Sequence, residues 1–264
     1  MPDLSSSEAR HDPERPADRR AGLVAALGCC LLTACGGDQS PSRSGQTADT
    51  RLRIARAAAT GGDPELAAAM YGAAAEGGQA DVALQLKAAD GLGRNGDIAG
   101  AEETLKRALQ ANPGQTDLLR AIGLAHVAED RPEQAIIELD RVLAARPNDA
   151  GVMMDKAVAL DLMHRHAEAQ SLYRKALAIT PHDMDISNDL AVSMMLQGRL
   201  RDAEAVLAPL QSADTSSERM KNNLAVVYAA SGDAAKARRL TGDGVSAQTL
   251  KALAQALPKG VNDQ

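Results

Sequence analysis

Small residues recur at intervals of 34 positions along most of the chain. One column is alanine in all six positions, which are Ala67, Ala101, Ala135, Ala169, Ala203 and Ala237. A second small column lies twelve residues earlier and comprises Ala55, Ala89, Gly123, Ala157, Ala191 and Ala225. Because a methyl group or a hydrogen lets two helices approach closely, we expect each pair to mark the contact within one helical hairpin. A fixed period of this length predicts a repeat architecture.

Three further columns predict where each hairpin packs, turns and ends. Large apolar residues form one column, Tyr71, Leu105, Leu139, Tyr173 and Leu207, with Thr241 as a degenerate sixth member. A glycine column is expected to supply the turns, because glycine adopts left-handed backbone conformations readily. Its members are Gly62, Gly96, Gly198 and Gly232, and Asp130 and His164 occupy the two remaining positions. Proline cannot continue a helix, so the remaining column closes units at Pro113, Pro147 and Pro181.

The period predicts an all-α fold of about six stacked hairpins at residues 48–251, followed by a capping helix. One hairpin cannot bury its own apolar face, so neighbouring hairpins must form the core together. Residues 241–244 should break the sixth unit's second helix early. Ser246 should then cap a last helix that ends before Pro258. Its apolar face is expected to comprise Leu250, Leu253 and Leu257.

Composition agrees with thin helical layers. The chain has no Phe, no Trp and three Tyr, so large aromatic side chains cannot fill a wide interior. The net charge is −6. The scattered Lys and Arg residues form no basic patch in the sequence, and there are almost no aromatic side chains to stack on bases, so nucleic acid is not expected as a partner. We expect protein partners and no small-molecule substrate.

Residues 1–34 have the pattern of an export signal, in which two arginines precede the uncharged run 21–34. That run is too short to span a bilayer. Its end, Leu32-Thr33-Ala34-Cys35, resembles the lipobox of bacterial lipoproteins. The resemblance implies cleavage before Cys35 and an acyl lipid on its thiol. Residues 35–47 then form the lipidated cysteine and a flexible tether, and residues 252–264 the remainder of the capping helix and a tail.

Short patterns that could carry catalysis or metal binding lack the surroundings they need. Residues 91–96 match G-x-G-x-x-G, but no strand precedes them. The two histidines within 164–166 lie in a predicted turn without further ligands. The acidic pairs within 102–103 and 183–185 lie at predicted helix starts, where acids favour the helix dipole. We therefore expect no enzyme activity and no cofactor besides the acyl lipid.

The repeat pattern at residues 48–251 resembles the tetratricopeptide repeat family. The resemblance implies a right-handed α-solenoid whose first helices line a concave, peptide-binding groove. Transferring that geometry gives the candidate groove residues Asp117, Arg120, Leu124, Met154, Val158, Asn188, Val192, Asn222 and Val226, with Val127, Asp161, Met195 and Ala229 beside them. The corresponding positions of the first two repeats are charged, namely Arg53, Arg56, Lys87 and Asp90. We expect a partner to dock across repeats three to six; alternatively, several of these Val and Met residues fill the core between helices.

The lipobox, tether, array and closing motif together resemble the TadD-type lipoproteins of tight-adherence (Flp) pilus assembly. The motif runs Asn222-Asn223-Leu224-Ala225-Val226-Val227-Tyr228, then Gly232-Asp233 and Ala237-Arg238. The resemblance implies a scaffold on the periplasmic face of the outer membrane that binds the pilus secretin or other assembly proteins. Gly36 after the cysteine favours the outer over the inner membrane.

Three other functions remain open from the sequence. The first is a lipoprotein adaptor for peptidoglycan hydrolases or for outer-membrane protein assembly. The second is a cytosolic chaperone with an uncleaved N-terminus. The third, an enzyme with the repeats as an appendage, is disfavoured because no segment outside the repeats is long enough for a catalytic domain.

Overall fold

A computed structural model describes residues 42–210, 217–242 and 246–258. Over these ranges the chain forms thirteen α-helices, one short 3-10 helix and no strand, which confirms the all-α prediction. None of the helices in the described part is both long and apolar enough to cross a membrane. The predicted signal peptide and Cys35 lie outside the described residues.

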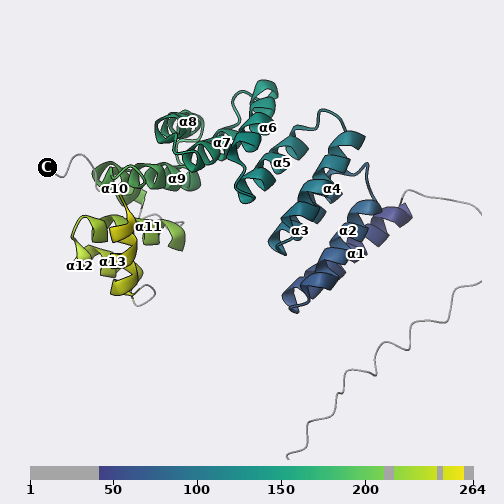
Figure 1. Cartoon of the computed structure of the whole chain (residues 1–264), viewed down its shortest axis with the longest axis horizontal. Coiled ribbons are helices and arrows are strands. Elements are labelled where there is room, and N and C mark those ends of the chain that lie inside the picture. The colour runs from purple at the N-terminus through teal and green to yellow at the C-terminus, as the bar shows by residue number, and fades with distance from the viewer. Residues whose placement is uncertain (1–41, 211–216, 243–245, 259–264) are drawn as a thin grey trace, which may run out of the picture. The chain divides into compact units, whose positions relative to one another are not determined.

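The helices pair into six hairpins in chain order (Figure 1). The first three are α1 (Ser42–Thr60) with α2 (Pro64–Glu76), α3 (Val82–Arg94) with α4 (Ile98–Ala111), and α5 (Thr116–Ala128) with α6 (Pro132–Ala145). The others are α7 (Ala150–Leu162) with α8 (His166–Ile179), α9 (Met184–Met195) with α10 (Leu200–Leu207), and α11 (Glu218–Ala230) with α12 (Ala234–Thr241). Helix α13 (Ala247–Ala256) follows.

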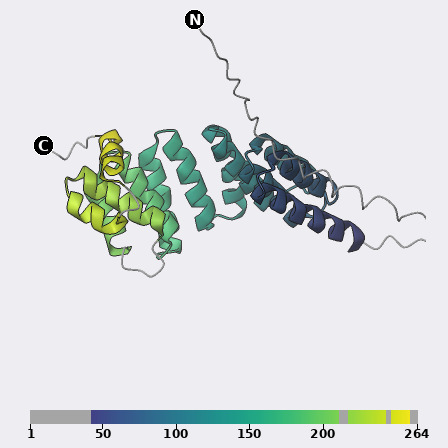
Figure 2. The same cartoon turned by 90° about the horizontal axis from the view of Figure 1, so that it is seen from below.

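Each second helix packs on its own first helix and on the first helix of the next hairpin. The views of Figures 1 and 2 agree on this side-by-side order. First helices also contact their successors, as α7 does with α9 and α9 with α11. The solenoid of consecutive hairpins is therefore continuous from α1 to α12, and its core is shared between neighbours.

The predicted small and large columns form that core. Every alanine of the six-member column is at most 4% exposed. The large column is equally buried, with Leu139 and Leu207 fully covered and Tyr173 1% exposed. At Gly123 an added Cβ would lie 3.0 Å from the Cγ of Leu139, so a small residue is needed there. Close contact within each hairpin, inferred from the period, is confirmed.

All six turn positions adopt left-handed backbone, including the two without glycine. The four glycines of the column have φ between 72° and 87°. Asp130 and His164, which interrupt the column, have φ of 55° and 58°. Aspartate and histidine are enriched several-fold among non-glycine residues in this region. The turn geometry is therefore conserved along the array although the residue type changes.

Aspartate side chains cap the start of six of the thirteen described helices. Those at the N-caps accept a hydrogen bond from a backbone N–H of the first turn, which satisfies an amide that lacks a helical partner. These caps are Asp63, Asp81, Asp97, Asp149, Asp183 and Asp233.

Two helix ends differ from the expected pattern. Helix α1 begins at Ser42, so residues 42–47, assigned to the tether from the sequence, are helical. Extending an existing helix costs little compared with nucleating one, which explains a polar first turn. Helix α10 ends after eight residues, at Leu207. A 3-10 turn over Ala208–Leu210 follows because Pro209 cannot continue an α-helix.

The end of the array matches the sequence in part. Helix α12 ends at Thr241, and the Ser246 hydroxyl caps α13 by accepting from the Thr249 amide, both as predicted. Leu250 is 3% exposed, but Leu253 is 48% exposed, so its predicted burial is wrong. Helix α13 packs mainly on α11 and has little contact with the short α12. The array therefore buries a smaller part of the α13 surface than the spacing of Leu250, Leu253 and Leu257 predicted.

Candidate functional site

The predicted groove residues lie on one side of α5, α7, α9 and α11, which we call the first-helix face. Leu124 is 42% exposed, and Asp117 is exposed as well. Five others are half-buried: Arg120, Met154, Val158, Val192 and Asn222. These seven residues have surface that a partner could contact.

Two of the predicted contact residues are mostly covered. Asn188 is 2% exposed and Val226 7%. The Asn188 Oδ1 accepts a hydrogen bond from the Nδ2 of Asn223 at 2.8 Å, which joins α9 to α11. Both side chains therefore pack inside the array, as the core alternative anticipated for Val226 but not for Asn188.

The two charged residues of the face, Asp117 and Arg120, form ion pairs inside the array. The Arg120 Nε lies 2.6 Å from the Asp155 Oδ2, which links α5 to α7. Burial raises the pKa of Asp155 although the hydrogen bond from Arg120 opposes this change. Asp117 accepts from the Arg146 Nη1 at 2.9 Å. The Arg120–Asp155 pair thus joins successive repeats, and the Asp117–Arg146 pair joins the two helices of the third repeat. The apolar residues are therefore the part of the face left for a partner.

Two leucines that were not predicted from the sequence complete the apolar part of the face. Leu162 and Leu196, 34 positions apart at the ends of α7 and α9, are 45% and 44% exposed. Each lies four residues, about one helical turn, after a predicted contact, Val158 or Val192. Their 34-residue spacing is a signal in the sequence that could have identified them.

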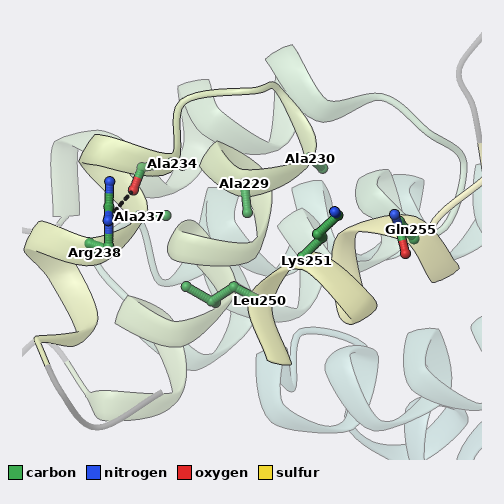
Figure 3. Close-up of a pocket in the computed structure, with 8 residues that line it drawn as sticks. All are labelled: Ala229, Ala230, Ala234, Ala237, Arg238, Leu250, Lys251 and Gln255. Atoms are coloured by element: carbon green, nitrogen blue, oxygen red, sulfur yellow. Dashed lines mark hydrogen bonds between the residues drawn. The ribbon is translucent and has the colours of Figure 1, made fainter. Parts of the chain in front are cut away.

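The row of Leu162 and Leu196 continues at Ala230, which lines a pocket of about 520 Å³ (Figure 3). Helices α11, α12 and α13 supply its lining, which consists of Ala229, Ala230, Ala234, Ala237, Arg238, Leu250, Lys251 and Gln255. The small alanines leave the space, and Leu250 gives it an apolar side. The pocket extends the apolar part of the first-helix face to the end of the array.

A buried polar cluster joins the second and third repeats. Ligand atoms of Glu102, His126 and Glu129 lie within 4.8 Å of one another, a spacing that could hold a metal ion. The Arg131 guanidinium, however, contacts both carboxylates and supplies the positive charge. Glu102 is the fifth residue of α4 and is 7% exposed, so its predicted position at the helix start is wrong. The Arg131 contact explains how this carboxylate can be buried.

The electrostatics of this cluster favour a fixed ion pair. Burial alone would raise the pKa of Glu102, but hydrogen bonds from Lys106 and Arg131 outweigh it and lower the pKa. Burial lowers the pKa of His126, and the charge of Arg131 lowers it further. Glu102 therefore stays ionised and His126 neutral near neutral pH. The arrangement ties α4 to α5 and α6 through the contacts of Arg131 and Glu102.

A second polar cluster joins the fourth and fifth repeats. Asp161 accepts hydrogen bonds from the Ser193 hydroxyl at 2.7 Å and the Tyr173 hydroxyl at 3.2 Å. Its Oδ1 also lies 2.7 Å from the Nδ1 of His166. The carboxylate links two hydroxyls and an imidazole from α7, α8 and α9 in one polar network. Asp161 thus has a structural role, although it was expected beside the groove.

Searches against known proteins agree with this architecture. Two family profiles described as tetratricopeptide repeat match, one at residues 94–153 and 162–222 and the other at residues 52–116. An uncharacterized Sinorhizobium fredii protein, y4yS, is 39% identical over 74 residues, which is 28% of this chain and 41% of that protein. The chain thus matches less than half the length of this relative.

Solved structures share the fold at low sequence identity. A tetratricopeptide repeat protein from Parabacteroides merdae has a TM-score of 0.64 at 14% identity, covering 79% of this chain and 83% of its own. PilW, titled a widely conserved type IV pilus biogenesis factor, has a TM-score of 0.63 at 19% identity and covers 79% and 98%. Pseudomonas aeruginosa PilF has a TM-score of 0.59 at 15% identity and covers 81% and 98%.

The profiles cover more than half of the residues between them, and the hairpins they match are those of the structure. Tetratricopeptide repeats serve as protein-interaction scaffolds, typically without enzymatic activity. This chain belongs to the tetratricopeptide repeat family.

Proposed function

We propose that this protein is a lipid-anchored scaffold that binds another protein through the first-helix face of repeats three to six, during assembly of a tight-adherence (Flp) pilus. The observation that carries the proposal is the exposed apolar part of this face, Leu124, Leu162 and Leu196, since these large side chains remain more than 40% exposed on, or directly after, three adjacent first helices. An exposed apolar row on packed helices suits an amphipathic partner helix or an extended peptide.

The pilus assignment has two supports. The closing motif within residues 222–238 resembles TadD-type lipoproteins. The fold is similar to that of PilW, a type IV pilus biogenesis factor; at 19% identity this similarity concerns the fold only. The secretin or another assembly protein is the partner we propose, on the periplasmic face of the outer membrane. An adaptor for peptidoglycan hydrolases is the second candidate, because the same surface would serve it.

Deleting the gene should abolish surface pili and adhesion, and the wild-type gene should restore both. Electron microscopy of intact cells counts the pili, and immunoblotting checks whether the secretin still forms its multimer. Normal pili together with altered cell-wall hydrolysis would instead favour the adaptor function.

The proposed anchor predicts that Cys35→Ala moves the protein from the membrane to the soluble fraction. Several acyl chains on one cysteine hold a protein stably, whereas a single chain holds it only marginally. Fractionation and metabolic labelling with a clickable fatty acid measure the change. Cys30→Ala is the matched control, because the lipobox reading places Cys30 in the cleaved segment. Undiminished labelling of the Cys35→Ala protein would refute the anchor.

A further inference from the structure

The first and second repeats form a basic pocket, although no basic patch was expected from the sequence, and the protein-binding face does not use this pocket. It is an open depression of about 580 Å³ between α1 and α3. Its lining consists of Asp49, Thr50, Leu52, Arg53, Arg56 and Lys87. Leu52 is buried and the other five are exposed, so the accessible lining has three cations and one carboxylate.

The cations of this pocket differ from most others in the array. In the described part of the chain, most basic residues from α3 onward form ion pairs, such as Arg120 with Asp155 and Arg146 with Asp117. Arg56 and Lys87 form none with any described residue. Charges that the fold leaves unpaired and exposed remain available to an external anion.

The position of this pocket in the sequence indicates which anion it would meet. Helix α1 begins at Ser42, seven residues after Cys35, and seven residues of chain span at most about 25 Å. The sequence of α1 contains four arginines and one aspartate, a net charge of +3 in a chain of net charge −6. If Cys35 carries the lipid, the basic end of the array is thus confined near the bilayer.

We infer that the pocket of Arg53, Arg56 and Lys87 binds the anionic headgroups of the membrane to which the chain is tethered; this inference rests on the proposed lipid anchor. Phosphate groups of the lipids pair with the three cations. The acidic remainder of the array is repelled by the same surface. Together these forces place α1 and α3 against the bilayer and keep repeats three to six away from it, where the first-helix face is open to a protein.

Binding of the purified full chain to vesicles tests the inference without any protein partner. One set of vesicles is phosphatidylcholine alone, and the other contains equal parts of phosphatidylcholine and phosphatidylglycerol. The ratio of the affinities for anionic and neutral vesicles measures the electrostatic contribution to binding. Residues 1–41, including their apolar run, are identical in all variants, so their contribution is the same in each. The test variant carries R53A, R56A and K87A. The control removes three exposed cations of α8 and α10 that have no described ion pair, through R174A, K175A and R201A.

Each basic residue near an anionic surface contributes about fivefold in affinity. The preference of the wild-type chain for anionic vesicles should therefore fall at least tenfold in the test variant and stay within about twofold in the control. Circular dichroism and melting curves check that all three proteins are folded.

An equal preference in the wild-type and test proteins would overturn the inference, as would an equal loss in the control. If the test variant keeps its lipid preference but no longer retains a protein partner, the pocket recognises an acidic protein, and the inference is again wrong. Failure of the anchor would appear separately, as unchanged acyl labelling in Cys35→Ala.

Discussion

Replacing Tyr173 with alanine is expected to lower the free energy of unfolding by about 3–5 kcal/mol, the usual cost of removing a buried aromatic side chain. Tyr173 is 1% exposed and belongs to the hydrophobic cluster formed by the fourth, fifth and sixth hairpins. Burial and the charge of Asp161 both raise the pKa of its hydroxyl, so the group remains protonated and donates to Asp161.

Tyr173→Phe separates packing from hydrogen bonding. It keeps the ring and removes the donor to Asp161, which should cost about 1 kcal/mol. Urea unfolding followed by circular dichroism gives both values. In a repeat array each unit is stabilised by its neighbours, so the alanine variant should expose the C-terminal hairpins to protease before the N-terminal ones. If Tyr173→Ala and Tyr173→Phe have equal effects, the ring does not contribute the packing described.

The 34-residue period was sufficient to predict the hairpins because each column has one local cause. An alanine such as Ala135 is needed wherever two helices of a hairpin touch, and it is fully buried. The turn at Asp130 could be assigned from its place in the glycine column, and its φ is 55°. Such constraints repeat with the backbone, so the sequence displays them directly.

The polar contacts between repeats were not predictable in the same way. Arg131 reaches Glu102 and Arg199 reaches Gln170, each pair being 29 residues apart. These side chains become neighbours only after one hairpin has stacked on the next. Arg131 and Arg199 are two periods apart, as are their acceptors Glu102 and Gln170. In the intervening repeat the acceptor position is occupied by Ile136, so the hydrogen-bonded pairs do not form a continuous column in the sequence.

The candidate site was predicted in part. Assigning contact residues to first helices located the correct elements, and Leu124 is exposed as expected. Val226 lies three periods after Leu124 and Asn188 one period after Met154, yet both are buried. They are buried because α9 and α11 pack together there, with a hydrogen bond between Asn188 and Asn223. Residue type alone does not tell whether a side chain is buried between two first helices or exposed on the surface of the face. The distinction depends on the spacing of the helices, which only the structure supplies.

The double substitution of Leu162 and Leu196 by aspartate should abolish partner binding while the array stays folded. Both side chains are more than 40% exposed, so a carboxylate at either position remains in water and the cost to folding is small. Val158 and Val192 are half-buried, and aspartate there would endanger the fold itself. The leucines are therefore the better test of the first-helix face.

Central apolar anchors at protein interfaces each contribute about 2 kcal/mol or more, so removing two should weaken binding by about 100-fold or more. A matched control changes Ile137 and Ile179 to aspartate. These isoleucines are 61% and 42% exposed and lie on the second helices α6 and α8, so the added charge and lost apolar area are similar. Capture of membrane proteins by each purified variant, quantified by mass spectrometry, and pilus counts in complemented deletion cells measure the outcome. Loss of binding in the isoleucine variant with retention in the leucine variant would place recognition on the second helices and refute the first-helix face.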